Sequence, residues 1–202
     1  MSALVNPVRA TRAMHNGVAA MFANKDANKT LEDVFLEALS AELGIRPDDY
    51  KASLERFCEN DLEELQSLVS GHGMAENLVD ASLSRGWQVV LATNPIFPRK
   101  VVDARVKWGG LNGNRFKHVT AYETAHFCKP NPDFFREILD LLGLEAGECL
   151  MVGNDPLHDL AACQVGMQTC LLTPWSISRT GVDFKPDWKG RHSELLALIE
   201  GS

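Results

Sequence analysis

Hydrophobic residues recur at helical spacing through the first third of the chain. An interval of three to four residues between apolar positions places them on one face of a helix. The spacing is loose over residues 1–23, which a polar loop at 24–29 follows. It becomes regular in two later stretches, one ending at Gly44 and one running from Pro47 to about Ser70. The pattern therefore predicts only helices in this part of the chain.

The first of the two regular helices has a defined start. Thr30 precedes the apolar run, and Asp33 follows it three positions later. A Thr hydroxyl at a helix start accepts a backbone N–H of the first turn, and an acidic side chain three residues on accepts the N–H of the Thr itself. Gly44 is a favoured helix end. We therefore expect a helix between Thr30 and Gly44.

After about residue 75 short apolar runs alternate with helical stretches. We expect strands at 87–92, 118–122, 149–152 and 168–173, and helices at 75–85, 99–108, 132–142, 159–165 and 192–199. Strands that alternate with helices predict a parallel sheet with right-handed crossovers. The fold class is therefore α/β, a Rossmann-like parallel sheet with helices on both faces. We divide the chain into a helical part at 1–72 and an α/β part at 73–202.

The end of the third predicted strand carries the most distinctive side chains. The apolar run 149–152 suits a strand buried on both faces, and Gly153 lets the backbone turn sharply after it. Asp155 then lies at the carboxyl end of the strand, the edge where open α/β sheets bind ligands. Asp159 follows about one helical turn later and faces the same place. Paired carboxylates of this kind suit a hard cation such as Mg²⁺.

Two further groups are predicted at the same edge of the sheet. Thr93 and Asn94 follow the first apolar run, and a hydroxyl with free backbone N–H groups at such a turn suits a phosphate oxygen. Lys129 stands directly before a proline and a helix, where it offers a point positive charge. Each group alone also fits an ordinary turn, a solvated lysine or a helix cap. Their order along the chain is the stronger signal.

Composition excludes some classes of function. The chain has 202 residues and a formal charge of −7, which argues against a general nucleic-acid binder and against an anionic membrane surface. No apolar run approaches the roughly 18 residues of a membrane span. Residues 1–14 lack the apolar core of a secretory signal. The five cysteines match no zinc spacing. Cys149 and Cys170 fall in apolar runs, where we expect small buried side chains, and we expect a cytoplasmic location.

The order Thr93, Lys129, Asp155 and Asp159 resembles the haloacid dehalogenase-like (HAD) hydrolase superfamily. The second motif of that family is a Ser or Thr after a strand, the third is a Lys, and the fourth is an acidic pair in a Gly-Asp-x-x-x-Asp setting. The resemblance covers residues 75–175. The helices before about residue 70 are similar to the small helical cap of the family, in partial form.

The resemblance implies hydrolysis of phosphoesters through an aspartyl-phosphate, with Mg²⁺ as cofactor and a small phosphorylated substrate. Thr93 and the N–H of Asn94 would hold phosphate oxygens, and Lys129 would offset negative charge. Asp155 would bind the metal. Asp159 would bind it indirectly or steady Lys129.

One family feature is missing. The first motif, a strand that ends in Asp-x-Asp, has no counterpart before the cap. The nearest string, 26–30, has Asn28 where the acid/base Asp belongs, and polar residues precede it. Since this strand lies in the middle of the family's sheet, the resemblance implies a fold without its first, central strand. The chain as written is therefore expected to be inactive or impaired.

Three explanations of the missing motif stay open. The chain is a truncated hydrolase, or a homodimer or other partner completes the sheet with a strand. The third explanation is a non-catalytic module that binds a phosphorylated ligand or a protein.

Overall fold

The computed structural model describes residues 6–201, and their contacts group into two compact units. The first unit comprises the described residues up to Ser70 together with Ala92–Gly109 and Val119–Cys128. The second comprises Gly71–Leu91, Gly110–His118 and the described residues from Lys129 onward. The units alternate along the chain, whereas the prediction divides it once, between residues 72 and 73. That division into cap and core stays a prediction.

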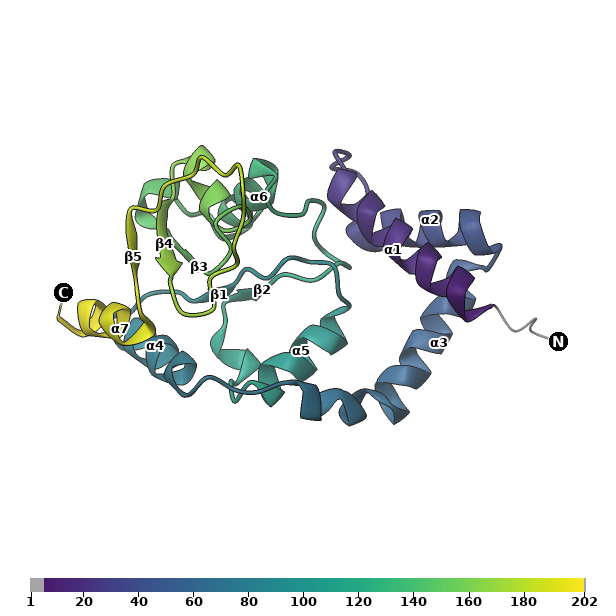
Figure 1. The fold of residues 1–202 in the computed structure, drawn as a ribbon, viewed down its shortest axis with the longest axis horizontal. Helices are drawn as coiled ribbons and strands as arrows, with labels where there is room; N and C mark the ends of the chain where they lie inside the picture. The colour runs from purple at the N-terminus through teal and green to yellow at the C-terminus, as the bar shows by residue number, and fades with distance from the viewer. Residues whose placement is uncertain (1–5, 202) are drawn as a thin grey trace. The chain divides into compact units, whose positions relative to one another are not determined.

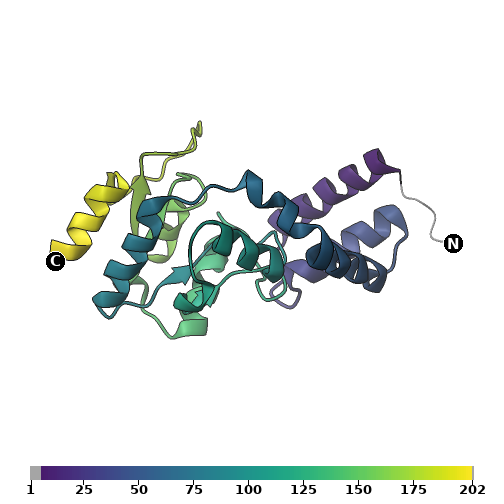
Figure 2. The same ribbon diagram turned by 90° about the horizontal axis from the view of Figure 1, so that it is seen from below.

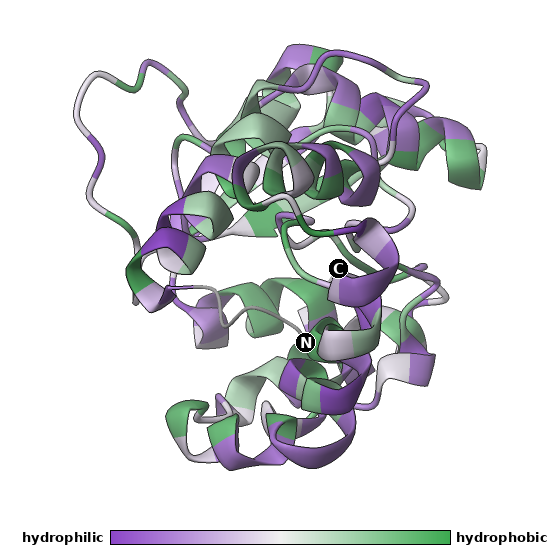
Figure 3. Ribbon diagram, turned by 90° about the vertical axis from the view of Figure 1, so that its right-hand side faces the viewer, coloured by the Kyte–Doolittle hydropathy of each residue, from purple (hydrophilic) through white to green (hydrophobic). Residues whose placement is uncertain are grey.

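The first unit is helical, as the apolar spacing predicts (Figure 1). It contains α1 (Pro7–Ala23), α2 (Leu31–Leu43), α3 (Pro47–Asn60), the 3₁₀ helix η1 (Leu62–Leu68) and α5 (Arg99–Trp108). Hydrophobic and hydrophilic residues are interleaved along the helices (Figure 3). Burial of the hydrophobic face is what stabilises such helices in water.

Close packing between α1 and α2 depends on a glycine. A Cβ built on Gly17 would lie 2.7 Å from a ring carbon of Phe35, so any larger residue would force the ring or the helix to move. Phe35 is buried, and its ring lies beside Tyr50 and Tyr122, with centroid distances of 5.5 and 6.4 Å. This aromatic group is the centre of the first unit's core.

The predicted start of α2 is confirmed. The N–H of Asp33 donates to the Thr30 hydroxyl at 3.2 Å, and the N–H of Thr30 donates to the Asp33 carboxylate at 3.1 Å. The two side chains therefore satisfy two backbone donors that the helix cannot. Gly44 ends the helix in the left-handed conformation, with φ of 69°.

The second unit holds a parallel sheet and its helices. Strands β3 (Leu150–Gly153), β4 (Gln168–Leu172) and β5 (Trp188–Gly190) pair in this order and all run parallel (Figure 1). Its helices are α4 (Gly73–Ser84), α6 (Pro132–Leu142) and α7 (His192–Gly201), with the short 3₁₀ helices η2 (Gly113–Arg115), η3 (Ala146–Glu148) and η4 (Leu160–Val165). Helix α7 lies beside α4 (Figure 2).

The sheet is interrupted where the resemblance implies a missing strand. Strand β1 (Val90–Leu91) pairs with β2 (His118–Val119) in a separate two-stranded sheet, and β3 is an edge of the other sheet. In the family pattern the absent strand belongs between the strands that precede Thr93 and Asp155. The predicted α/β fold without its central strand is thus the fold observed in the described residues.

Three local expectations need correction. Strand β3 is not buried on both faces, since Leu150 and Val152 keep 43% and 37% of their surface exposed. Leu150 and Val152 lie on the same face of the strand, opposite to the buried Met151, so this face is only partly covered. The predicted helix at 159–165 is the 3₁₀ helix η4, and β5 was not predicted at all. Strand β5 is a three-residue segment without an apolar run, so no periodicity reveals it.

No helix within residues 6–201 combines the length and the apolar character that a membrane crossing requires.

Replacing Thr30 by Ala removes the hydroxyl acceptor of the α2 cap, and we expect a loss of about 1 kcal/mol in the free energy of unfolding. Urea denaturation followed by circular dichroism measures it. Thr30→Ser is the matched control, because it keeps the hydroxyl and should stay within about 0.5 kcal/mol of the wild type. Equal stability of all three proteins would show that the cap contributes nothing.

Candidate functional site

The turn after β3 is built around the side chain of Asp159. One carboxylate oxygen of Asp159 (Oδ2) accepts the backbone N–H groups of Asn154 and Asp155, each at 2.9 Å. A Cβ on Gly153 would overlap this carboxylate, so the strand end needs glycine for the close approach. Gly153 is predicted as the turn after the strand. It is needed there because the Asp159 carboxylate packs directly against it.

The other oxygen of Asp159 binds Lys129. Its Oδ1 lies 2.6 Å from Lys129 Nζ, and the two side chains are only 8% and 6% exposed. A buried charge pair of this kind depends on further hydrogen bonds to offset the loss of water. Asp159 has them in the two backbone N–H groups, and the Lys129 ammonium also lies 5.7 Å from the centroid of the Phe134 ring, within cation–π distance.

The residues that follow Lys129 lead directly into helix α6. A cis peptide bond joins it to Pro130, and Asn131 then caps α6 by accepting the N–H of Asp133 at 2.9 Å. The first helical residue is Pro132, which suits that position because its missing N–H would have no helical partner. Lys129 therefore directly precedes a well-defined helix start, as the sequence predicts.

Asp155 forms a second, separate charge group. Its Oδ1 accepts the backbone N–H groups of Leu157 and His158 at 3.0 and 3.3 Å. Arg179 donates to both of its oxygens, from Nε to Oδ1 at 3.2 Å and from Nη2 to Oδ2 at 2.5 Å. His158 Nδ1 lies 3.1 Å from Oδ2. The carboxylate is thus almost fully used by groups of this chain.

The surroundings change the acidity of both side chains. Burial by itself would raise the pKa of Asp155, but the hydrogen bonds from Arg179 and from the backbone outweigh it, and the pKa is lowered. Burial lowers the pKa of His158, against the opposing effect of Asp155. Asp155 is therefore ionised and His158 mostly neutral near pH 7. The His158 side chain is 22% exposed and lies against Asp155.

The structure brings three predicted residues together, namely Lys129, Asp155 and Asp159 in the second unit. Thr93 and Asn94 belong to the first unit, where the Thr93 carbonyl accepts the Thr120 hydroxyl at 2.6 Å. Their place beside the other three stays a prediction.

Sequence reasoning missed Arg179. It lies 24 residues beyond Asp155 in a segment without periodicity, and no motif marks it.

Mg²⁺ takes an octahedral shell of oxygen ligands. Both carboxylates already pair with a cation, Asp159 with Lys129 and Asp155 with Arg179. Within the described residues, no three His, Cys, Asp or Glu side chains gather to hold a metal ion. In this arrangement the side chains do not fit a magnesium ion. The prediction that Asp155 and Asp159 are metal ligands stays a prediction.

Comparison with known proteins agrees with this fold. Residues 71–165 match the family of haloacid dehalogenase-like hydrolases, and this range contains all five predicted site residues. A stretch of 151 residues is 28% identical to the protein SUPPRESSOR OF QUENCHING 1, chloroplastic, of Arabidopsis thaliana. That alignment covers 74% of this chain but only 14% of the plant protein, so the chain spans a small part of that relative's length.

Solved structures show the same fold at low sequence identity. The L-2-haloacid dehalogenase RSc1362 has a TM-score of 0.60 at 18% identity, over 96% of this chain and 85% of that chain. A HAD phosphatase from Thermococcus onnurineus has a TM-score of 0.55 at 18% identity, over 93% and 80%. The HAD-hydrolase YfnB from Bacillus subtilis, solved with magnesium, has a TM-score of 0.56 at 20% identity, over 99% and 85%.

The predicted resemblance to the haloacid dehalogenase-like hydrolase superfamily is therefore confirmed. The family match supports this resemblance over residues 71–165, and the structural neighbours share the fold over most of the chain.

Replacing Lys129 by Met leaves the buried Asp159 carboxylate without its cation, and we expect a loss of about 3–5 kcal/mol in the free energy of unfolding. The double variant Lys129→Met/Asp159→Asn removes both charges and keeps an oxygen that can accept the two backbone N–H groups. It should recover much of the loss in urea denaturation. A single variant as stable as the wild type would contradict the buried pair.

The lowered pKa of Asp155 makes stability depend on pH in acid. A carboxyl whose pKa is lower in the folded state stabilises that state above its unfolded pKa, near 3.8, and the stabilisation is lost as pH falls through the lower folded pKa. Asp155→Asn should therefore be less stable than the wild type at pH 6, with the difference shrinking below about pH 4. Urea unfolding at a series of pH values tests this. A difference that is constant with pH would contradict the assignment.

Proposed function

We propose that this chain is the phosphate-recognising part of a HAD-type hydrolase that acts on small phosphorylated molecules. One observation carries the proposal: Lys129 is buried at the carboxyl end of β3 and held by Asp159 at 2.6 Å. Open α/β sheets bind ligands at this edge. The Lys129 ammonium brings a compact positive charge to this edge, and such a charge attracts an anion such as phosphate. The match to haloacid dehalogenase-like hydrolases and the fold shared with a HAD phosphatase support this class of ligand.

In this proposal the residues of the chain bind and orient the phosphate. Lys129 offsets the negative charge that phosphate oxygens bring to the site. The Thr93 hydroxyl and the Asn94 N–H hold two further oxygens in this proposal, as the family pattern implies. Asp159 fixes the position of Lys129, and this is the second of the two roles predicted for it.

The same chain lacks the group that would attack phosphorus. An aspartyl-phosphate needs a carboxylate nucleophile, and the family supplies it from an Asp-x-Asp motif. That spacing of two aspartates occurs nowhere in the sequence. We therefore propose that these 202 residues bind phosphoesters without hydrolysing them, and that turnover requires a nucleophile from outside this sequence.

Dependence on Mg²⁺, a cytoplasmic location and a strand-completing partner or second copy are further proposals. The magnesium-bound YfnB structure supports the first by fold alone. The edge position of β3, with Leu150 and Val152 exposed, supports the last. We propose no binding of nucleic acid or membrane, in keeping with the charge of −7.

A second candidate is a non-catalytic module that binds a phosphorylated ligand or a protein. The observation that favours it is the pairing of Asp155 with Arg179, which ties up a carboxylate that the family's chemistry assigns to a metal.

Titration with inorganic phosphate, followed by calorimetry, tests the binding proposal. Thr93→Val removes the hydroxyl at nearly constant volume, and we expect about tenfold weaker binding, equivalent to about 1.4 kcal/mol. Thr93→Ser is the matched control and should bind as the wild type does. Absence of saturable phosphate binding by the wild type would overturn the proposal.

Turnover assays separate the remaining alternatives. We expect the chain to release neither phosphate from p-nitrophenyl phosphate nor chloride from 2-chloropropionate, because it lacks the nucleophile. Phosphate release that survives Asp155→Ala would contradict both the missing nucleophile and the assigned site. Chloride release would instead favour the haloacid chemistry named for the neighbour RSc1362.

A further inference from the structure

The segment between β4 and β5 returns to the end of β3. The N–H of Ile177 donates to the Asn154 carbonyl at 2.9 Å, and the Asn154 side-chain amide donates to the Trp175 carbonyl at 2.8 Å. These two hydrogen bonds run in opposite directions between the same two stretches of chain. They hold residues 175–177 against the turn that carries Asp155.

This attachment places Arg179 on Asp155. The guanidinium donates through Nε and Nη2 to the two oxygens of the carboxylate, at 3.2 and 2.5 Å. Such a two-point contact matches the planar fork of arginine to the planar carboxylate and is stronger than a single hydrogen bond. The Asp155 side chain is 7% exposed, whereas that of Arg179 is 34% exposed. Arg179 therefore covers the carboxylate from the solvent side.

The contact leaves little of Asp155 for a cation. A carboxylate has about four lone-pair positions. Arg179, the N–H groups of Leu157 and His158, and the ring of His158 together approach both oxygens. A divalent cation at Asp155 would also lie close to the positive guanidinium. Cation binding and the Arg179 contact are therefore mutually exclusive at this carboxylate.

We propose that Arg179 is a built-in counter-ion that competes with divalent cations for Asp155. The segment between β4 and β5 then controls cation access to the site, and a cation binds Asp155 only when Arg179 leaves it. Asn154 is a positioning residue, because its side chain and carbonyl hold the segment that delivers Arg179. The inference does not rest on phosphate binding or on turnover, since it concerns the metal alone.

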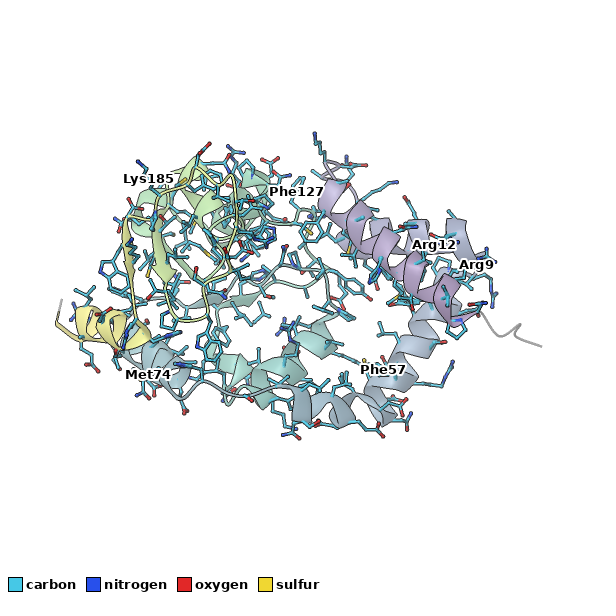
Figure 4. All side chains as sticks on the ribbon, viewed as in Figure 1. Arg9, Arg12, Phe57, Met74, Phe127 and Lys185 are labelled. Atoms are coloured by element: carbon cyan, nitrogen blue, oxygen red, sulfur yellow. The ribbon has the colours of Figure 1, made fainter. Side chains whose placement is uncertain are left out.

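Titration of the full chain with Mn²⁺, with free Mn²⁺ measured by electron paramagnetic resonance, tests the competition. Arg179→Gln removes the charge, and we expect Mn²⁺ binding at least about tenfold tighter than in the wild type. Lys185→Gln is the matched control, because it removes a cation from the same segment (Figure 4) and should leave Mn²⁺ affinity unchanged. Adding Asp155→Asn to Arg179→Gln should abolish the gain.

A second variant guards against a folding defect. Arg179→Lys keeps the positive charge but loses the two-point contact, and it should bind Mn²⁺ with intermediate affinity. Equal Mn²⁺ affinity of the wild type, Arg179→Gln and Arg179→Lys would overturn the proposal. A gain in Arg179→Gln that persists when Asp155 is replaced would overturn it as well, because the cation would then bind elsewhere.

Discussion

The ion pair between Lys129 and Asp159 is the interaction on which the rest of the site depends. Both side chains are buried, and their atoms lie 2.6 Å apart. The carboxylate of Asp159 also accepts the N–H groups of Asn154 and Asp155, so the same side chain shapes the turn after β3. This turn orients Asp155. It also carries Asn154, to which residues 175–177 are hydrogen-bonded. Gly153 is needed because any side chain there would displace Asp159.

Charge balance is the second theme of the site. Two carboxylates, Asp155 and Asp159, each have a cationic side chain of this chain as partner, and the two partners come from separate segments. In surroundings poor in water an unpaired charge is costly, so the pairs are held in fixed geometry. The guanidinium of Arg179 contributes both to the lowered pKa of Asp155, together with the backbone N–H groups of Leu157 and His158, and to the poor fit to Mg²⁺.

The sequence reveals features whose cause is local. The α2 cap needs only Thr30 and Asp33, and α5 and α6 begin and end where the sequence predicts because their start and stop residues are adjacent to them. The interrupted sheet follows from a motif that the family has and the sequence lacks. Long-range contacts leave no comparable signal. Strand β5 exists through pairing with β4, and Arg179 reaches Asp155 only through the fold.

Lys129, Asp155 and Asp159 therefore lie close together in the second unit. Asp159 pairs with Lys129, and Asp155 pairs with Arg179. The most direct test of this account is a crystal structure of the chain grown with Mg²⁺. The account predicts that Asp159 stays bonded to Lys129 Nζ and that Arg179 keeps both oxygens of Asp155. A magnesium ion coordinated directly by Asp159, with Lys129 turned away, would contradict it.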